Sequence, residues 1–264
     1  MRTLTGRVAA GAGPIEVHGW NAITTAFDGV DTFYNTFWMR TGNPGSGGRD
    51  YSQALDRSHA LVAAATAAGV RRIVHLSVAH ADHPDAAEYP YFAAKTDVEA
   101  AVRATGIAHT IVRPALIFGG GPGLVEQLAG VLRRVPVMGI AGDGSYRIRP
   151  VHVDDVARLC LAHPDGIVDA VGPDRPTYEE FVRAVAAALG TRRLFVHLPT
   201  GMVVAAGRVL GKLARQELVT ADELRSTVAG LADTDGPPTG TRSVLAWVAE
   251  QGRALGRGAP ADAR

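Results

Sequence analysis

A tyrosine and a lysine stand four residues apart in the segment Y-F-A-A-K, as Tyr91 and Lys95. Enzymes use both side chains to transfer protons, and on a helix this spacing places them on one face. The chain has two lysines and six tyrosines, so chance produces such a pair about one time in twenty, and the motif alone is moderate evidence. The alternative is structural: a tyrosine that packs on the stem of a lysine on a partly exposed helix.

The residues before this pair favour the functional interpretation. Ser77 ends the apolar segment R-R-I-V-H-L-S, which has the composition of a buried strand. Parallel sheets bind their ligands at the carboxyl ends of their strands. We therefore expect Ser77, Tyr91 and Lys95 to converge beside one cleft.

Strand and helix patterns alternate from residue 15 to about residue 175. The β-branched and aromatic composition of strands occurs in 15–20, 31–38, 71–79 and 108–119. Helical spacing occurs in 52–69 and 90–106, each of which ends at a glycine, and Pro90 occupies the first position of the second helix. Strands that alternate with helices of this length predict an α/β fold, a doubly wound parallel sheet covered on both faces.

The pattern changes after residue 135. Residues 135–153 predict a hairpin around Asp143 and Gly144, and a short helix and a strand are expected over 154–162 and 166–173. Two capping boxes then start helices: Thr177 with Glu180, and Thr220 with Glu223. We expect three units: an α/β domain over 1–175, a small, mostly helical region over 176–255, and a flexible tail over 256–264.

The overall composition excludes several classes of protein. The formal net charge of +1, from 27 basic and 26 acidic residues, gives no electrostatic reason to propose nucleic acid or an anionic membrane as a partner. The single Cys160 cannot form an internal disulfide. No apolar run is long enough to span a bilayer and the N-terminus lacks a signal-peptide pattern, so a cytoplasmic location is expected. No metal site is predicted, because His75, His80 and His83 lack a second cluster of ligands.

Six longer segments indicate a family. They are F-D-G-V-D-T-F-Y-N (27–35), A-G-V-R-R-I-V-H-L-S (68–77), Y-F-A-A-K (91–95), I-V-R-P-A-L-I-F-G (111–119), G-D-G-S-Y-R-I-R-P-V-H-V-D-D-V-A (142–157) and V-G-P-D-R-P-T-Y-E-E (171–180). Together they resemble the short-chain dehydrogenase/reductase superfamily, in its extended and atypical NmrA-like branches with their epimerase/dehydratase relatives. The resemblance covers residue 2 to about residue 250. It implies a Rossmann-like NAD(P)-binding domain over 1–175, NADP or NAD as cofactor, and a small-molecule substrate bound by the C-terminal region.

The resemblance also implies roles for single residues. Tyr91 would donate or accept the proton at the substrate oxygen. Lys95 would lower the pKa of that phenol, ordinarily near 10, and hydrogen-bond the nicotinamide ribose, while Ser77 would orient the substrate carbonyl. Three other residues in the six segments quoted above are expected to contact the cofactor: Asn35, Arg113 and Pro114. We interpret three further polar residues as structural: His152, Asp154 and Asp155.

The glycine-rich stretch T-G-R-V-A-A-G-A-G over 5–13 is not a dinucleotide fingerprint. That fingerprint needs a strand, a glycine turn and a helix whose N-terminus faces the pyrophosphate, whereas here Pro14 and a new strand follow at once. Residues 2–7 align better as the second strand of the fold, and 15–20 as the third. The first strand, its glycine loop and the first helix, about thirty residues, would then be absent. We therefore expect a shortened reading frame that binds dinucleotides weakly, with a natural variant as the alternative.

Two classes of function remain. The first is an NAD(P)-dependent oxidoreductase or epimerase-like enzyme acting on a small-molecule carbonyl or hydroxyl, which Ser77, Tyr91 and Lys95 favour. The second is a non-catalytic sensor or assembly protein with an NAD(P)-binding fold, which the missing phosphate loop favours. Arg7 follows the second strand, where an arginine can accommodate the extra phosphate of NADP, although a solvated arginine explains it equally well. The sequence identifies neither the substrate nor whether the protein forms a homodimer.

Overall fold

The computed structural model of the chain describes residues 23, 25–38, 51–121, 123–214 and 221–255. Several sequence predictions fall outside these residues and stay predictions. They are the strands over 2–7 and 15–20, the stretch 5–13, Arg7, the N-cap Thr220 and the tail over 256–264.

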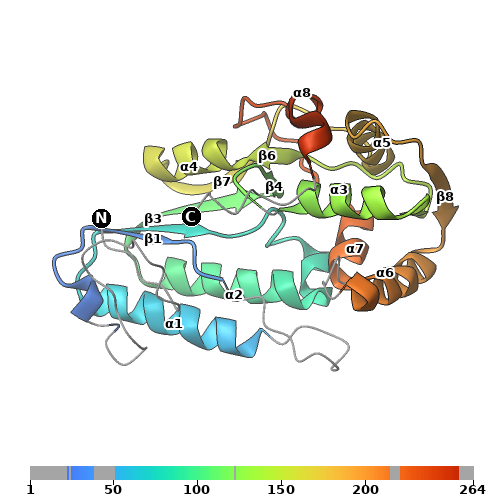
Figure 1. Cartoon of the computed structure of the whole chain (residues 1–264). Helices are drawn as coiled ribbons and strands as arrows, with labels where there is room; N and C mark the ends of the chain where they lie inside the picture. Colours follow the sequence, from blue (N-terminus) through green and yellow to red (C-terminus); the bar gives the residue numbers. More distant parts are fainter. Residues whose placement is uncertain (1–22, 24, 39–50, 122, 215–220, 256–264) are drawn as a thin grey trace.

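A four-stranded parallel sheet forms the centre of the fold (Figure 1). Its strands, in spatial order, are β1 (Thr32–Asn35), β2 (Arg72–Leu76), β3 (Ala108–Pro114) and β7 (Gly166–Ala170). The register pairs Asn35 with His75, and Leu76 with Val112, so the carboxyl ends of β1, β2 and β3 meet at one edge. Within the described residues, β1 pairs on one side only, with β2. The predicted parallel α/β sheet is confirmed.

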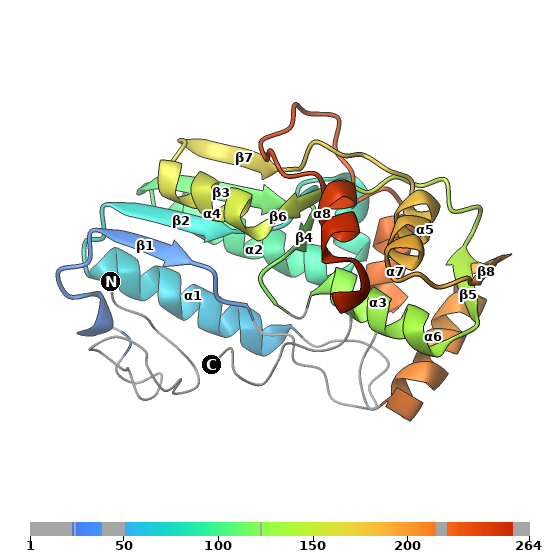
Figure 2. The ribbon, with the colours of Figure 1, turned by 45° about the horizontal axis from the view of Figure 1, so that its top comes forward.

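Helices cover both faces of this sheet (Figures 1 and 2). Helices α1 (Ser52–Ala67) and α2 (Pro90–Ala104) pack on one face, and α4 (Val153–Ala162) packs on the other. As predicted, Pro90 begins α2, and the helices α1 and α2 are followed by Gly69 and Gly106, whose φ angles are +72° and +69°. Glycine adopts this left-handed backbone without steric cost, which explains why the sequence pattern located both ends.

The predicted strand over 108–119 is interrupted, and the predicted hairpin is wrong. After Pro114 the chain leaves the central sheet, and β4 (Leu116–Phe118) pairs in parallel with β6 (Pro150–His152). The turn at Asp143 exists: its Oδ1 accepts hydrogen bonds from the backbone N and Oγ of Ser145, at 2.9 and 2.7 Å. The strand before this turn, β5 (Val137–Ala141), pairs in parallel with β8 (Leu194–Leu198) instead of with the segment after it. The sequence predicted the turn at Asp143 correctly, but the strand before the turn pairs with a distant strand and not across the turn.

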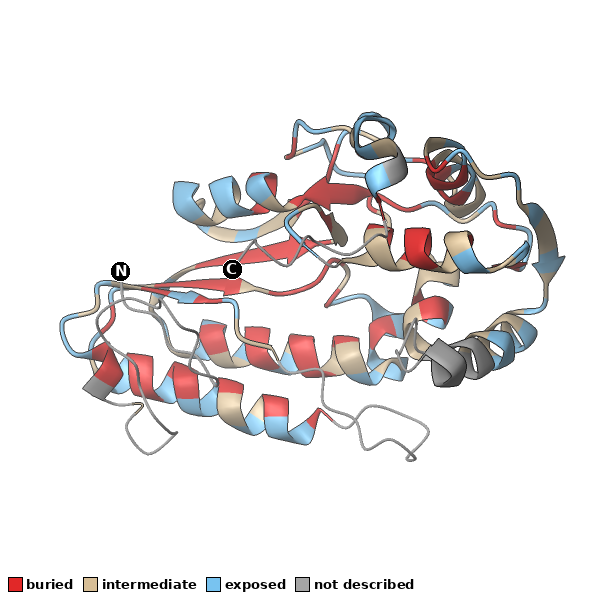
Figure 3. Ribbon diagram, in the orientation of Figure 1, coloured by how far each residue is buried: buried red, intermediate tan, exposed pale blue. Residues whose placement is uncertain are grey.

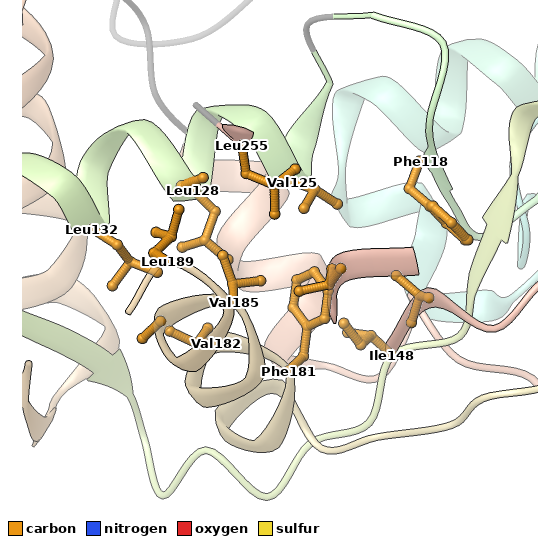
Figure 4. Packing of buried hydrophobic residues seen from close by; sticks show 14 of the residues in the cluster. Phe118, Val125, Leu128, Leu132, Ile148, Phe181, Val182, Val185, Leu189 and Leu255 are labelled. Carbon is orange, nitrogen blue, oxygen red and sulfur yellow. The ribbon is translucent and has the colours of Figure 1, made fainter. Parts of the chain in front are cut away.

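A second hydrophobic core lies beyond the sheet, among α3 (Leu124–Arg134), α5 (Tyr178–Ala188) and α8 (Val244–Gln251). Figure 4 shows side chains of α3 and α5 interleaved, and Figure 3 shows buried residues along these two helices. The predicted capping box starts α5: Glu180 N donates to Thr177 Oγ1 at 3.2 Å, and Thr177 N donates to Glu180 Oε2 at 2.8 Å. The remaining elements are α6 (Thr200–Ala214), α7 (Ala221–Val228) and the short turns Thr25–Phe27, Pro84–Glu88 and Gly252–Ala254.

None of the helices in the described part of the chain is both long enough and apolar enough to cross a bilayer.

Candidate active site

Ser77 lies directly beyond the carboxyl end of β2. Its backbone N donates to Val112 O at 2.8 Å, and two residues later Ala79 N donates to Pro114 O at 2.9 Å, so β3 fixes the path of the chain here. The Ser77 side chain is 3% exposed, and its Oγ finds no hydrogen-bond partner among the described residues. A buried hydroxyl without a partner is uncommon and is expected to meet a ligand or a water. Ser77 is therefore rigidly placed, with its hydroxyl available.

Helix α2 directs Lys95 and Tyr91 toward this strand end. Lys95 is 3% exposed, and its Nζ donates to the carbonyl of Leu76, the residue before Ser77, at 2.9 Å. The same Nζ lies 4.2 Å from the centroid of the Trp38 ring. Tyr91 meets that indole edge-on, with ring centroids 5.8 Å apart. Because both side chains contact Trp38, they lie on the same side of α2, as the four-residue spacing predicts.

Burial controls the protonation of Lys95. Removal of the ammonium from water lowers the pKa of Lys95 from 10.5 to about 7, although Glu99, one helical turn further along α2, opposes this shift. Lys95 is therefore divided between its charged and neutral forms near neutral pH. The charge of Lys95 therefore changes with pH near neutrality.

His75 lies beneath the same strand end and is neutral. Burial first, and the charge of Lys95 second, lower its pKa from 6.5 to about 3. Phe37 N donates to Asn35 Oδ1 at 3.3 Å, which orients the Asn35 amide so that its Nδ2 faces His75 Nδ1 at 3.1 Å. The donor and acceptor roles in this contact depend on which ring nitrogen carries the proton. His75 Nε2 is buried and has no partner within the described residues.

Arg113 connects the strand to two carboxylates. Its Nε and Nη2 donate to the two oxygens of Glu99 at 2.9 and 2.6 Å, in the parallel geometry that suits a guanidinium. Its Nη1 lies 2.9 Å from Asp82 Oδ1, in the loop after Ser77. Glu99 is fully buried, so Arg113 neutralises a carboxylate that burial alone would strongly disfavour. Sequence reasoning missed Glu99, although its position four residues after Lys95 places both on one helix face.

An aromatic cluster adjoins Lys95. Trp38 stacks on Tyr51, with ring centroids 5.7 Å apart and planes at 30°, and Tyr51 contacts Tyr91. Trp38 Nε1 is another buried donor without a partner among the described residues. Sequence reasoning also missed Trp38, which belongs to an aromatic strand-like segment with no motif of its own.

Three unsatisfied polar groups thus gather around Lys95: Trp38 Nε1, His75 Nε2 and Ser77 Oγ. All three follow or lie within β1 and β2, at the edge where this class of sheet binds dinucleotides. Each can donate a hydrogen bond, and a nicotinamide nucleotide and a carbonyl substrate both present acceptor oxygens. The donor set therefore fits a nicotinamide cofactor with a carbonyl compound beside it.

The other predicted cofactor residues have partners within the protein. Asn35 is buried at the end of β1 with its amide engaged by His75 and Phe37. The guanidinium of Arg113 is engaged by carboxylates, and Pro114, also buried, accepts a hydrogen bond from Ala79. Their direct contacts with a cofactor stay predictions. Among the predicted catalytic residues, Lys95 and Tyr91 share the Trp38 ring, and Lys95 binds the carbonyl of Leu76, the residue before Ser77.

The residues interpreted as structural have that role. Asp155 is 1% exposed, and its Oδ2 accepts hydrogen bonds from the backbone N of Thr241 and Arg242, at 3.1 and 3.2 Å. His152 Nδ1 caps α4 by accepting from Asp154 N at 3.1 Å. These contacts hold the segment before α8 against the start of α4.

Comparison with known proteins identifies the family. A family model described as NAD(P)H-binding matches residues 14–163, which is more than half of the chain. The chain belongs to the NAD(P)H-binding family. The match shows that the chain has an NAD(P)-binding domain, and the curated and structural neighbours of the chain belong to the NmrA-like, epimerase-like and short-chain reductase group that the sequence resembles.

Two curated relatives each match 59% of the chain. Ceramide reductase of Caulobacter vibrioides is 32% identical over 161 residues, which are 59% of this chain and 50% of that protein. The mitochondrial NADH-ubiquinone oxidoreductase 40 kDa subunit of Neurospora crassa is 30% identical over 161 residues, 59% of this chain and 41% of that protein. The chain thus spans half or less of the length of these relatives.

The fold resembles that of solved reductases. The Citrobacter sp. triphenylmethane reductase complexed with NADP(H) superposes with a TM-score of 0.71 at 17% identity, over 92% of this chain and 84% of that one. At this identity the likeness shows the shared fold.

Proposed function

We propose that the protein is an NAD(P)-dependent oxidoreductase that interconverts a carbonyl and an alcohol on a small-molecule substrate. The observation that carries this proposal is the position of Lys95. Its ammonium donates to the carbonyl of Leu76, the residue before Ser77, whose hydroxyl has no partner among the described residues, and it shares the Trp38 ring with Tyr91. A proton donor, a cation and a free hydroxyl at the carboxyl end of a parallel sheet suit proton transfer at a substrate oxygen.

In the direction of reduction, bound NAD(P)H supplies the hydride to the carbonyl carbon. Ser77 Oγ–H donates a hydrogen bond to the carbonyl oxygen and orients it. The Tyr91 hydroxyl gives its proton to that oxygen as the alcohol forms, and solvent later restores the proton to the phenolate. The Lys95 ammonium stabilises the phenolate electrostatically, and this contribution is strong because the group is buried.

A non-catalytic function is the alternative, and one observation favours it. The Lys95 ammonium already has two partners, the Leu76 carbonyl and the Trp38 ring. If these contacts persisted in the bound state, Lys95 would have less capacity for a ribose hydroxyl. Such a protein would bind NAD(P) or a protein partner without turnover.

Isotope transfer separates the two proposals. The chain is incubated with NADPH or NADH carrying deuterium at the reactive nicotinamide carbon, together with aldehydes, ketones and quinones of graded size. An oxidoreductase transfers deuterium to the product carbon, in proportion to the cofactor oxidised. Binding of the cofactor, followed by nicotinamide fluorescence, with no transfer to any of these compounds would support the non-catalytic alternative.

A further inference from the structure

A cavity of about 300 Å³ lies away from the sheet, among α3, α6, α7 and the β5–β8 pair. In Figure 1 these elements gather beyond the carboxyl ends of the central strands. The volume is at the lower end of the range for small-molecule sites, roughly 300–1,000 Å³. Val137, which lines the cavity, is 48% exposed, so the cavity is open to solvent on the side of β5.

The described lining carries no charged side chain. Its only polar side chains among the described residues are the amide of Gln127 and the phenol of Tyr178, and the rest are apolar, as at Leu128, Val131 and Val203. Burial raises the pKa of Tyr178 to about 12, so the phenol is neutral at ordinary pH. A phosphate or carboxylate placed here would lose its hydration without gaining a cation, which is strongly unfavourable. The described part of the lining therefore favours uncharged ligands over charged ones such as nucleoside diphosphates.

Helix α7 lies between this cavity and the candidate active site. Leu224 of α7 lines the cavity. Just after α7, Leu231 belongs to a buried cluster with Phe92, and Tyr91 packs against the same cluster. The cavity is thus lined by a residue of α7, and the cluster against which Tyr91 packs contains a residue just after the same helix.

From these observations we propose that the cavity binds the apolar part of an uncharged substrate, an alkyl chain or an aromatic ring system, while the reacting carbonyl or alcohol lies outside the cavity at Tyr91. The proposal rests on the oxidoreductase function and names its substrate class: apolar carbonyl compounds or alcohols, not nucleotide sugars. The apolar lining supplies affinity because apolar ligand surface is removed from water when it enters the cavity.

Two glycines of α6 provide a matched pair of variants. Gly207 lines the cavity, and a Cβ there would meet no atom within 4 Å. A Gly207→Leu side chain therefore has room to occupy the cavity. Gly201, on the same helix, is exposed, does not belong to the lining and has the same open surroundings. Both substitutions replace a helical glycine by a better helix former, so neither is expected to destabilise α6.

The test measures binding of N-phenyl-1-naphthylamine, an uncharged dye that brightens in apolar surroundings, to the chain without cofactor. We expect saturable binding to the wild type, about tenfold or more weaker binding to Gly207→Leu, and unchanged binding to Gly201→Leu. A long-chain aliphatic aldehyde should displace the dye, whereas UDP-glucose should not. Absence of saturable binding, equal affinities of the two variants, or displacement by UDP-glucose would overturn the proposal.

A further variant separates this proposal from the proposed function. Tyr91→Phe should bind the dye like the wild type, because Tyr91 does not line the cavity. If dye binding follows Gly207 while deuterium transfer is absent, the cavity is confirmed and the oxidoreductase function fails. If transfer occurs and proceeds equally well in Gly207→Leu with long-chain aldehydes, the function stands and the assignment of the cavity to the substrate fails.

Discussion

Because Lys95 is buried, we expect the free energy of unfolding to depend on pH. Lys95 is 3% exposed, and burial lowers the pKa of its ammonium from 10.5 to about 7. Between these two values the unfolded chain holds a proton on this side chain that the folded chain lacks. The free energy of unfolding therefore increases as the pH rises through this window. Raising the pH favours the folded state because it removes a charge that the fold buries at a cost.

The size of the effect follows from the two pKa values. With 10.5 for the unfolded and about 7 for the folded chain, the free energy of unfolding should rise by about 2 kcal/mol between pH 7 and pH 9. The window ends at pH 9 because burial raises the pKa of Cys160 above its ordinary value of 9, and the tyrosines titrate above that. Those groups would counteract the rise at higher pH.

Urea unfolding at pH 7, 8 and 9, followed by circular dichroism, measures the effect. Lys95→Met keeps an apolar stem of similar length without the charge, so its stability should change little over the same interval. The difference between the two proteins is the quantity to compare, since it cancels groups that titrate in both. Parallel pH dependences for the wild type and Lys95→Met would refute the burial of an ionisable Lys95.

Three further predictions follow from the site. The kcat/KM for carbonyl reduction should fall as the pH rises through about 7, because Lys95 loses its charge there; a profile flat from pH 6 to 8.5 would contradict this. Glu99→Gln should lower the free energy of unfolding by about 3 kcal/mol, because Arg113 keeps its charge without its buried partner; a loss below about 1 kcal/mol in urea titrations would count against that pairing. Acidification from pH 6.5 to 5 should lower the free energy of unfolding of the wild type by roughly 2 kcal/mol more than that of His75→Gln. The reason is that His75 binds a proton in the unfolded chain over this range, whereas the buried ring, with a pKa of about 3, does not. The control is the same substitution at the exposed His59. An equal pH dependence of the free energy of unfolding in His75→Gln and in the wild type would be evidence against a buried neutral ring.

Local patterns in the sequence predicted the parallel sheet and its helices well. Pro90 and Gly106 bound α2 through their own backbone preferences, and the Thr177–Glu180 capping box starts α5. Such signals lie within a few residues of the element that they define. The hairpin at Asp143 failed because pairing partners are set by distant strands: β5 pairs with β8, over fifty residues away in the sequence.

The candidate site was predictable only where chemistry and spacing are local. Tyr91 and Lys95 share a helix face, and Ser77 ends a strand, so the sequence indicated all three. The pairing of Arg113 with Glu99 joins a strand to a helix, and the contact of Trp38 with Lys95 depends on how the chain turns after β1. Neither contact has a sequence signal, although the continued four-residue spacing from Lys95 to Glu99 points to a shared face.

The proposed mechanism requires Tyr91 to transfer a proton at a substrate oxygen beside a bound nicotinamide. The most direct measurement is kcat/KM for Tyr91→Phe, with Tyr89→Phe as control, on the best substrate from the deuterium-transfer experiment. Tyr89 precedes α2 and contacts Phe92, so its variant also removes a nearby hydroxyl. We predict a loss of about 100-fold or more for Tyr91→Phe and little change for Tyr89→Phe. A loss of only a few-fold in Tyr91→Phe, or equal losses in both variants, would contradict the account.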